Sequence, residues 1–337
     1  MRSTKLPSWS RRLLGFTPLQ SPPHVFALDG RGLRYAQLGR ERLGLRCRAV
    51  RRVALPPDAF ASGLLGGPLR DAASFQRTAA GLVQGVPGGV REASLVVPDS
   101  WLRVTFAECG DLPRGGPALD EVLRWKLRRL VPFRVDELRV GAAEVSALPG
   151  QAEPRRLLMG FAIEQLLAQL EDAFAALGIR IGHISNTSLS LLDALPPTGP
   201  RSFVALALVD DDGYTLVIAR RGEPVLHRYK GLTGSASPSA PLATPASAVR
   251  GGAVVRDLRL TRNFLDEHFP GSALDAVLLL ARPDLEPEWL ELLERGLGRS
   301  AAPVDGRVLP PLRGDGGGAL NWRELAPMTG AARREVA

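Results

Sequence analysis

The chain has 337 residues, of which 45% are hydrophobic and 23% charged, so it can bury the cores of two globular domains. Its formal charge is +8, and nearly all of the positive charge is arginine, because Lys5, Lys126 and Lys230 are the only lysines. No run reaches the roughly 20 apolar residues of a membrane-spanning helix, and the N-terminus lacks the apolar core of a signal peptide. We therefore expect a cytoplasmic protein.

Composition also argues against several kinds of site. The arginines are spread along the chain and aromatic residues make up only 6%, so we expect no nucleic-acid partner. Cys47 and Cys109 have neither disulfide nor zinc-ligand spacing, and we predict no metal site. The 4 histidines are scattered, and none stands beside a serine or cysteine in a nucleophile motif. We predict no catalytic residues.

In chain order, residues 1–21 form a basic leader that we expect to be flexible, although Trp9 and the leucines after it would also suit contact with lipid or a partner helix. From residue 22 to 99 the pattern predicts three strands, a helix around 70–84 and a short buried strand that Pro98 ends. This order is typical of a mixed α/β domain.

Residues 100–178 predict an inserted subdomain. A strand at 101–109 precedes a helix that begins at Pro117, because proline is favoured in the first turn of a helix. Two further strands and a second helix, which Gly178 ends, complete the segment. The insert therefore has the order strand, helix, strand, strand.

Residues 179–199 are predicted to return to the first domain, and residues 200–337 repeat its pattern of strands and helices. Within the second copy, the segment 234–252 is rich in Ala, Pro and Ser and is predicted to be a mobile loop. The repetition predicts an α/β fold made of two copies of one domain, the first of which carries the insert.

Two such halves resemble the duplicated actin-like (ribonuclease H-like) fold of the actin-like ATPase superfamily, and the order within the insert resembles its FtsA-like branch. The stretches "PDSWLRVTFAECGDLP" and "VLRWKLRRLVPFRVDELRV" resemble the PilM family of type IV pilus assembly proteins, with its proline-ended strand, its Trp-containing helix end and its "PF" turn. The stretches "EDAFAALGIRIGHISNTSLSLLDAL" and "VVRDLRLTRNFLDEHF" are similar to later parts of that family. The resemblance covers about residues 24–330.

What the resemblance implies is a cytoplasmic protein at the inner face of the inner membrane. It would bind the cytoplasmic N-terminal tail of a PilN-like membrane protein in a groove between the first domain and the insert, with pilus motor ATPases and self-association as further contacts. The cytoplasmic domain of the type II secretion protein GspL is similar in role. Trp125, Arg129, Val131 and Phe133 are predicted to border the groove, since aromatic and arginine side chains often anchor interfaces. Packing of Trp125 under the sheet of the insert is the alternative.

Superfamily members that bind ATP carry a phosphate loop in the first hairpin of each half. In "VFALDGRGLRYAQL", Arg34 falls where a lysine is expected and Asp29 where a glycine is expected. A shifted loop keeps Asp29 and Gly30 in place but makes the hairpin too short. Arginine is not an equivalent phosphate partner, so this motif is predicted to be a remnant.

The second candidate loop is "LVDDDGYTLVI". Asp210 matches the expected aspartate, but Asp212 stands in the place of a glycine, and only Gly213 and one further residue separate it from Thr215. A carboxylate there would repel phosphate. An Asp-Gly hairpin turn explains the same letters, and a divalent ion bound by the aspartates without nucleotide is another alternative.

The sequence therefore predicts a non-enzymatic scaffold of a type IV pilus or related secretion machine, with a degenerate nucleotide site and no cofactor. An ATP-binding switch of the same machine is the alternative. A membrane-tethering cell-division protein is less favoured, because no amphipathic helix is evident after "MTGAARREVA".

Overall fold

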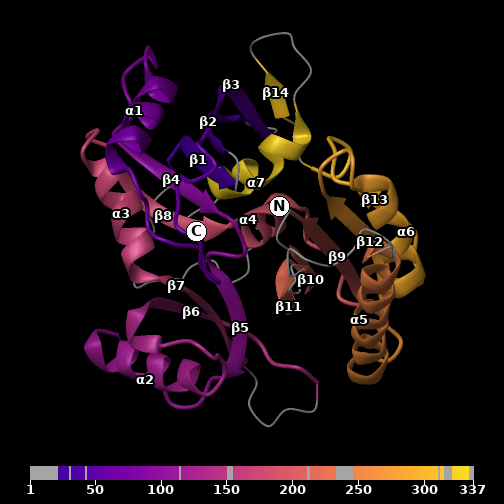
Figure 1. The fold of residues 1–337 in the computed structure, drawn as a ribbon. Helices are drawn as coiled ribbons and strands as arrows, with labels where there is room; N and C mark the ends of the chain where they lie inside the picture. Colours follow the sequence, from indigo (N-terminus) through magenta and orange to yellow (C-terminus); the bar gives the residue numbers. More distant parts are fainter. Residues whose placement is uncertain are drawn as a thin grey trace, which may run out of the picture.

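The computed structural model of the protein contains a six-stranded, a five-stranded and a three-stranded sheet. Figure 1 shows them as a first domain, a second domain beside it and a small insert attached to the first. The structure describes residues 22–29, 32–41, 44–113, 115–149, 155–210, 213–232, 246–309, 312–314 and 321–333.

The six-stranded sheet of the first domain has the order β14-β3-β2-β1-β4-β8, in which β1, β2 and β3 form an antiparallel meander and β4 and β8 run parallel to β1. Phe26 and Phe75 are fully buried where α1 packs on one face of this sheet. The carboxylate of Asp71 begins α1 by accepting a hydrogen bond of 2.9 Å from the N–H of Ser74. The elements are β1 (His24–Asp29), β2 (Gly32–Glu41), β3 (Gly44–Ala54), α1 (Ala72–Val83), β4 (Glu92–Val97), β8 (Arg180–Asn186) and α4 (Thr187–Ala194).

The three-stranded antiparallel sheet forms the insert, in the order β5-β7-β6. Leu123 and Leu127 of its helix are buried on this sheet, together with Leu65 from the loop between β3 and α1. The predicted order and the predicted start at Pro117 are both present. The elements are β5 (Arg103–Glu108), α2 (Pro117–Arg128), the 3-10 turn η2 (Val135–Glu137), β6 (Leu138–Ser146) and β7 (Arg155–Ile163).

Helix α3 (Glu164–Ala175) does not belong to the insert, although the prediction placed it there with the rest of 100–178. Its Leu170 and Phe174 are fully buried in the core of the first domain, where Phe174 contacts Phe26 with ring centroids 4.6 Å apart. The apolar stripe of α3 therefore covers the six-stranded sheet, and the insert ends with β7.

The second domain is built on the five-stranded sheet, with the order β11-β10-β9-β12-β13. Apolar side chains of α5 and α6, among them Leu258 and Leu293, pack on one of its faces. Helix α6 ends at Gly298, whose φ of 69° is the left-handed conformation typical of a helix C-terminus. The elements are β9 (Ser202–Val209), β10 (Gly213–Arg220), β11 (Glu223–Gly231), α5 (Ala246–His268), β12 (Ala273–Leu280), α6 (Glu286–Leu297) and β13 (Ala301–Pro303).

The two domains share one topology. In each, a three-stranded antiparallel meander is extended by two strands that run parallel to its first strand: β4 and β8 beside β1, and β12 and β13 beside β9. The duplicated α/β fold predicted from the sequence is therefore confirmed.

The C-terminal segment crosses back to the first domain, whereas the prediction assigned all of 200–337 to the second. Strand β14 (Leu312–Gly314) pairs in parallel with β3, and α7 (Trp322–Arg333) packs on the first sheet. Leu325 and Met328 of α7 are buried there against Val25 of β1. Because α7 buries its apolar face on the first sheet, the assignment of all of 200–337 to the second domain is wrong.

Helices α4 and α7 lie side by side between the two sheets, in the middle of the molecule (Figure 1). Leu191 and Leu192 of α4 and Ala326 of α7 pack on the second sheet, while α7 also covers the first. Gly330 permits the close approach of the two helices, because a Cβ atom at this position would overlap the carbonyl oxygen of Ser190. The contact between domains therefore depends on how closely these two helices pack.

Of two further predicted segments, one is partly described and the other is not described. Helix α5 begins at Ala246, so the end of the predicted mobile loop 234–252 is helical. The predicted leader 1–21 lies outside the described residues. No helix in the described part of the chain is long and apolar enough to cross a membrane.

Strand β11 also ties the second domain to the insert. The buried guanidinium of Arg156 in β7 donates to the carbonyl of Val225 and lies 3.9 Å from the ring centroid of Phe106. Ser146 donates to the carboxylate of Glu223 at 2.6 Å. Burial lowers the pKa of Arg156 to about 10, although the nearby charge of Glu223 opposes the shift. The insert is thus joined to both domains.

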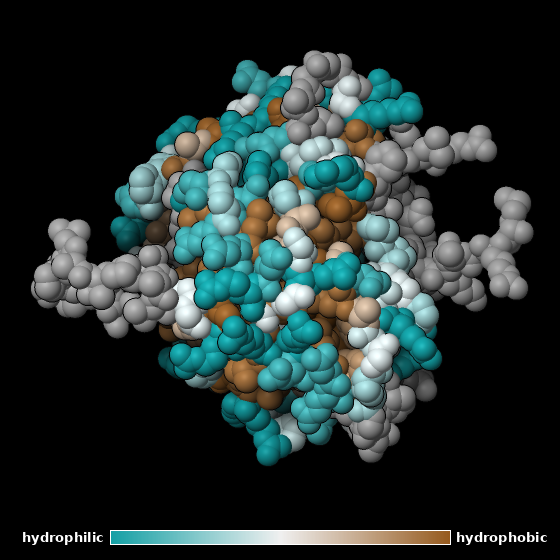
Figure 2. All heavy atoms as spheres, turned by 90° about the vertical axis from the view of Figure 1, so that its right-hand side faces the viewer, coloured by the Kyte–Doolittle hydropathy of each residue, from teal (hydrophilic) through white to brown (hydrophobic). Residues whose placement is uncertain are grey.

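The outer face of the second domain, formed by α5 and α6, carries small apolar patches separated by hydrophilic residues (Figure 2). Leu260 of α5 is 57% exposed there. Scattered exposed apolar side chains of this kind are normal on a protein surface and define no site by themselves.

Candidate functional site

Helix α2 presents the first candidate surface. Leu123 and Leu127 are buried on the sheet of the insert, which turns Trp125 outward, where it is 54% exposed. The guanidinium carbon of Arg129 lies 5.3 Å from the centroid of the Trp125 ring, a cation–π geometry. Trp125 therefore does not pack under the sheet, and Arg129 holds its ring at the surface.

Val131 and Phe133, the other residues predicted to border the groove, are turned toward the interior. Both are partly buried against the core of the insert, and the ring of Phe133 lies 6.2 Å from that of Phe161. The structure therefore divides the four predicted residues into an exposed pair, Trp125 and Arg129, and a pair that supports the insert from within.

The first predicted nucleotide motif is a tight hairpin. Asp29 pairs with Gly32 across the turn, so only two residues connect β1 to β2, and Gly30 is one of these and lies outside the described residues. The guanidinium of Arg34 forms an ion pair with the carboxylate of Asp29 and lies 3.4 Å from the carbonyl of Glu324 in α7. The charge expected to meet a phosphate is thus matched by a carboxylate of the same hairpin.

The second motif is also a two-residue turn. The N–H of Asp210 donates to the carbonyl of Gly213 at 3.0 Å, and the carboxylate of Asp210 accepts from the N–H of Gly213 at 2.8 Å. Thr215 is buried within β10, opposite Leu208 and Tyr229, and Asp212 lies outside the described residues. The carboxylate of Asp210 therefore stabilises its own hairpin, as an Asp-Gly turn does.

A buried carboxylate in α5 lies beside this second hairpin. Asp257 accepts hydrogen bonds from the Tyr214 hydroxyl at 2.6 Å and from Arg228 at 2.7 Å, and Lys230 lies 2.5 Å away. Burial alone would raise the pKa of Asp257, but the hydrogen bonds from Lys230 and Tyr214 outweigh it and hold that pKa below its usual value. Arg228 and Lys230 of β11 therefore form ion pairs with Asp257 of α5.

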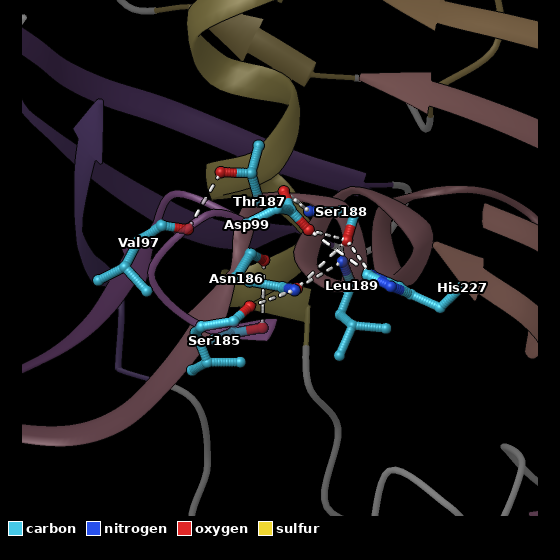
Figure 3. Close-up of polar contacts among 9 residues, drawn as sticks. Val97, Asp99, Ser185, Asn186, Thr187, Ser188, Leu189 and His227 are labelled. Atoms are coloured by element: carbon cyan, nitrogen blue, oxygen red, sulfur yellow. Dashed lines mark hydrogen bonds and ion pairs between the residues drawn. The ribbon is translucent and has the colours of Figure 1, made fainter. Parts of the chain in front are cut away.

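A polar cluster is buried where α4 meets both domains (Figure 3). The carboxylate of Asp99, which follows β4, accepts hydrogen bonds from the N–H and the hydroxyl of Ser188 at the start of α4. The Nε2 atom of His227, on β11 of the second domain, lies 2.8 Å from the same hydroxyl. Asn186 precedes α4, and its side-chain oxygen accepts a hydrogen bond of 3.0 Å from the N–H of Leu189. Its side-chain amide nitrogen donates to the carbonyl of Leu102. The cluster joins the two domains through hydrogen bonds.

Ser188, His227 and Asp99 do not have the arrangement of a catalytic triad. In a triad the histidine uses one ring nitrogen for the serine and the other for the carboxylate. Here Nε2 of His227 faces both the serine and Asp99, at 2.8 and 3.6 Å, while the buried Nδ1 has no hydrogen-bond partner among the described residues. All three side chains are buried, so the arrangement serves contact between the domains. This cluster could not be predicted from the sequence, because its members come from three distant segments.

In the part of the chain that the structure describes, no group of three or more His, Cys, Asp or Glu side chains is placed to hold a metal ion. Each of the two larger sheets contains a three-stranded meander extended by two parallel strands, carries helices on both faces and shares the helices α4 and α7 that lie between them, an arrangement typical of the actin-like class of fold. The chain is a member of that class with an insert in its first domain.

Comparison with solved structures shows a particular likeness in fold. The chain matches the PilM-PilN type IV pilus biogenesis complex with a TM-score of 0.68, at 15% identity, over 94% of this chain and 97% of that chain. It also matches the cytoplasmic domain of EpsL, an inner membrane component of the type II secretion system of Vibrio cholerae, with a TM-score of 0.45, at 11% identity, over 93% and 95% of the two chains. A Bacteroides thetaiotaomicron protein with an actin-like ATPase fold matches with a TM-score of 0.49, at 10% identity, over 92% and 96%.

No family model matches the chain, and no curated protein matches it. The solved structure of the PilM-PilN complex nevertheless confirms the predicted resemblance to PilM in the fold, over nearly the whole length of both chains.

Proposed function

We propose that this protein is a scaffold of a type IV pilus or related secretion machine. The observation that carries the proposal is the fold shared with the PilM chain from end to end, at a TM-score of 0.68. In this role the protein would lie at the cytoplasmic face of the inner membrane, held there by its partner, and would link the membrane platform to the motor ATPases.

The proposed partner is the cytoplasmic N-terminal tail of a PilN-like membrane protein, because the similar PilM chain occurs in a complex with PilN. The exposed Trp125, held by Arg129, supplies an anchor of the kind that dominates protein interfaces. Such a tail would bind as an extended peptide, through apolar contacts and backbone hydrogen bonds.

The experiment is a calorimetric titration with a synthetic peptide that has the sequence of the N-terminal cytoplasmic segment of a PilN-like membrane protein from the same organism. We expect saturable binding, weakened about tenfold or more by Trp125→Ala, because a central interface aromatic contributes about 2 kcal/mol. Leu260→Ala is the matched control, since Leu260 is similarly exposed, at 57%, but lies on the second domain. Equal affinities for the unmodified protein and Trp125→Ala would remove Trp125 from the interface, and no binding to either would contradict the proposed function.

We also propose that the nucleotide site is degenerate. Arg34 is matched by Asp29, the carboxylate of Asp210 accepts from its own turn, and a Cβ at Gly213 would lie 2.7 Å from the hydroxyl of Tyr229, so little room remains beside that glycine. Titration with Mg-ATP is therefore expected to give no heat and no shift of the thermal transition. Micromolar binding that Asp210→Ala abolishes would instead favour an ATP-binding switch of the same machine.

A further inference from the structure

Arg103 is the first residue of β5, a strand of the insert that also contacts β11 of the second domain. Its Nη2 atom donates at 2.7 Å to the carbonyl of Leu64, in the loop before α1. Its guanidinium carbon lies 4.4 Å from the ring centroid of Tyr229 in β11 and 5.9 Å from that of Phe133 in the insert. One cationic side chain therefore contacts all three parts of the molecule.

Among the residues that the structure describes, no carboxylate lies beside the charge of Arg103. Its partners among the described residues are one carbonyl and two aromatic rings, and its buried Nε atom has no hydrogen-bond partner. Burial lowers the pKa of Arg103, while the nearby Tyr229 opposes the shift. A partly buried cation without an anion is unfavourable, and a carboxylate that reached it would remove the cost.

Another half-buried arginine of the same chain has carboxylates that neutralise its charge. Arg139 in β6 is similarly half-buried, but it donates to the carboxylates of both Glu164 and Glu171, at 2.9 and 2.7 Å. The hydrogen bond with Glu164 raises the pKa of Arg139, and the bond with Glu171 adds to the effect. In the described part of the chain, one half-buried arginine thus has two carboxylate partners, whereas Arg103 has none.

An exposed leucine stands beside Arg103 and is held in place. Leu64 is 77% exposed, while its neighbour Leu65 is buried in the core of the insert. Gly66, at a φ of +77°, packs so closely that a Cβ there would lie 2.8 Å from the ring of Trp101. The loop is therefore held in place directly after Leu64, and the apolar side chain of Leu64 is exposed beside a positive charge that no carboxylate among the described residues matches.

We propose that Arg103 and Leu64 form a specificity-determining anchor for the partner tail, an inference that rests on the proposed function. Arg103 binds an Asp or Glu side chain of the tail through guanidinium N–H groups that Leu64 does not use, since arginine recognises carboxylates in a planar, bidentate manner. An adjacent apolar residue of the tail covers Leu64. Because Arg103 contacts both domains and the insert, the bound tail also holds the three parts in one arrangement.

The test uses the same tail peptide and a second peptide in which each Asp and Glu is replaced by Asn or Gln. With the acidic peptide, Arg103→Gln is expected to weaken binding about 30-fold, as loss of one partner of a desolvated charge pair does. With the neutral peptide, the unmodified protein and Arg103→Gln are expected to bind alike. Arg295→Gln in α6 removes the same charge from an exposed ion pair with Glu291 and should change neither affinity.

Three results would overturn the inference while the proposed function stands. In the first, Arg103→Gln binds the acidic peptide as tightly as the unmodified protein does. In the second, Arg103→Gln binds both peptides more weakly to the same extent, which would assign Arg103 a structural role alone. In the third, the tail binds tightly although it contains no Asp or Glu. Failure of the unmodified protein to bind any tail peptide would remove the proposed function and this inference together. The thermal transition of each variant verifies that it is folded, and Leu64→Ala supplies a second variant with the charge retained.

Discussion

Gly330→Ala is expected to lower the free energy of unfolding by about 3 kcal/mol, the upper end of the roughly 1–3 kcal/mol that overpacking typically costs, because the clash is with rigid backbone. The added methyl group would overlap the carbonyl oxygen of Ser190 and lie 2.9 Å from the backbone nitrogen of Ala194. Neither is the end of a flexible side chain, so α4 and α7 must separate. These helices fill the space between the two sheets, and their separation would loosen the contact between the domains. Thermal and denaturant unfolding measure the loss.

Gly81→Ala is the matched control for this change. Gly81 also lies inside a helix, α1, but a Cβ there would meet no atom within 4 Å. Replacement of a helical glycine by alanine in open space is expected to stabilise the protein by roughly 0.5–1 kcal/mol, because it reduces the backbone freedom lost on folding. Equal and small effects of the two substitutions would show that α4 and α7 do not pack this closely.

Sequence pattern was sufficient for elements that repeat an apolar period over many residues. The three strands at 24–54 and the helix that begins at Pro117 follow such periods, and they lie where the pattern predicted them. Strands β13 and β14 have only 3 residues each, too few for a period, and the prediction did not include them. Short strands of this kind depend on the neighbour with which they pair.

The packing partners of correctly predicted helices could not be read from the sequence. The apolar stripes of α3 and α7 show that each helix buries one face, but not which sheet it covers. Helix α7 reaches the first sheet from the far end of the chain, and α3 does so from the end of the insert. Both boundary corrections have this cause: chain order favours the nearest sheet, whereas the fold brings a distant one closer.

The exposed surface of α2 was predictable only in part. Trp125 lies off the stripe formed by Leu123 and Leu127, and it is exposed as its position in the helix implies. Leu130 continues the same spacing but is 47% exposed, because α2 ends at Arg128 and the helical period no longer applies. The contacts of Arg103 could not be predicted from the sequence, since its partners come from three separate parts of the fold.

Asp99→Ala is expected to cost about 3 kcal/mol of stability, the second large effect. The carboxylate accepts two hydrogen bonds from Ser188, and its loss would leave a buried N–H and a buried hydroxyl with fewer acceptors, at about 1–3 kcal/mol for each unsatisfied group. It would also alter the contact with His227 of the second domain, which shares the Ser188 hydroxyl. Hydrogen exchange should then show faster exchange of the first amides of α4, and calorimetry a lower transition temperature.

Asp136→Ala is the control for loss of a carboxylate, because the side chain of Asp136 is 77% exposed and lies 3.6 Å from Arg128 on the surface. Its effect on the free energy of unfolding is expected to stay within about 0.5 kcal/mol.

Asp99→Asn keeps one oxygen that can accept from Ser188, so it should lower the free energy of unfolding less than Asp99→Ala does. It therefore provides a folded variant should the alanine variant not fold. In a double-mutant cycle with His227→Ala, a coupling of about 1 kcal/mol would show that the cluster joins the two domains. Additive effects would mean that Asp99 stabilises the start of α4 alone, and that the domains are held together by the packing of α4 and α7 and by the contacts of β11 with the insert.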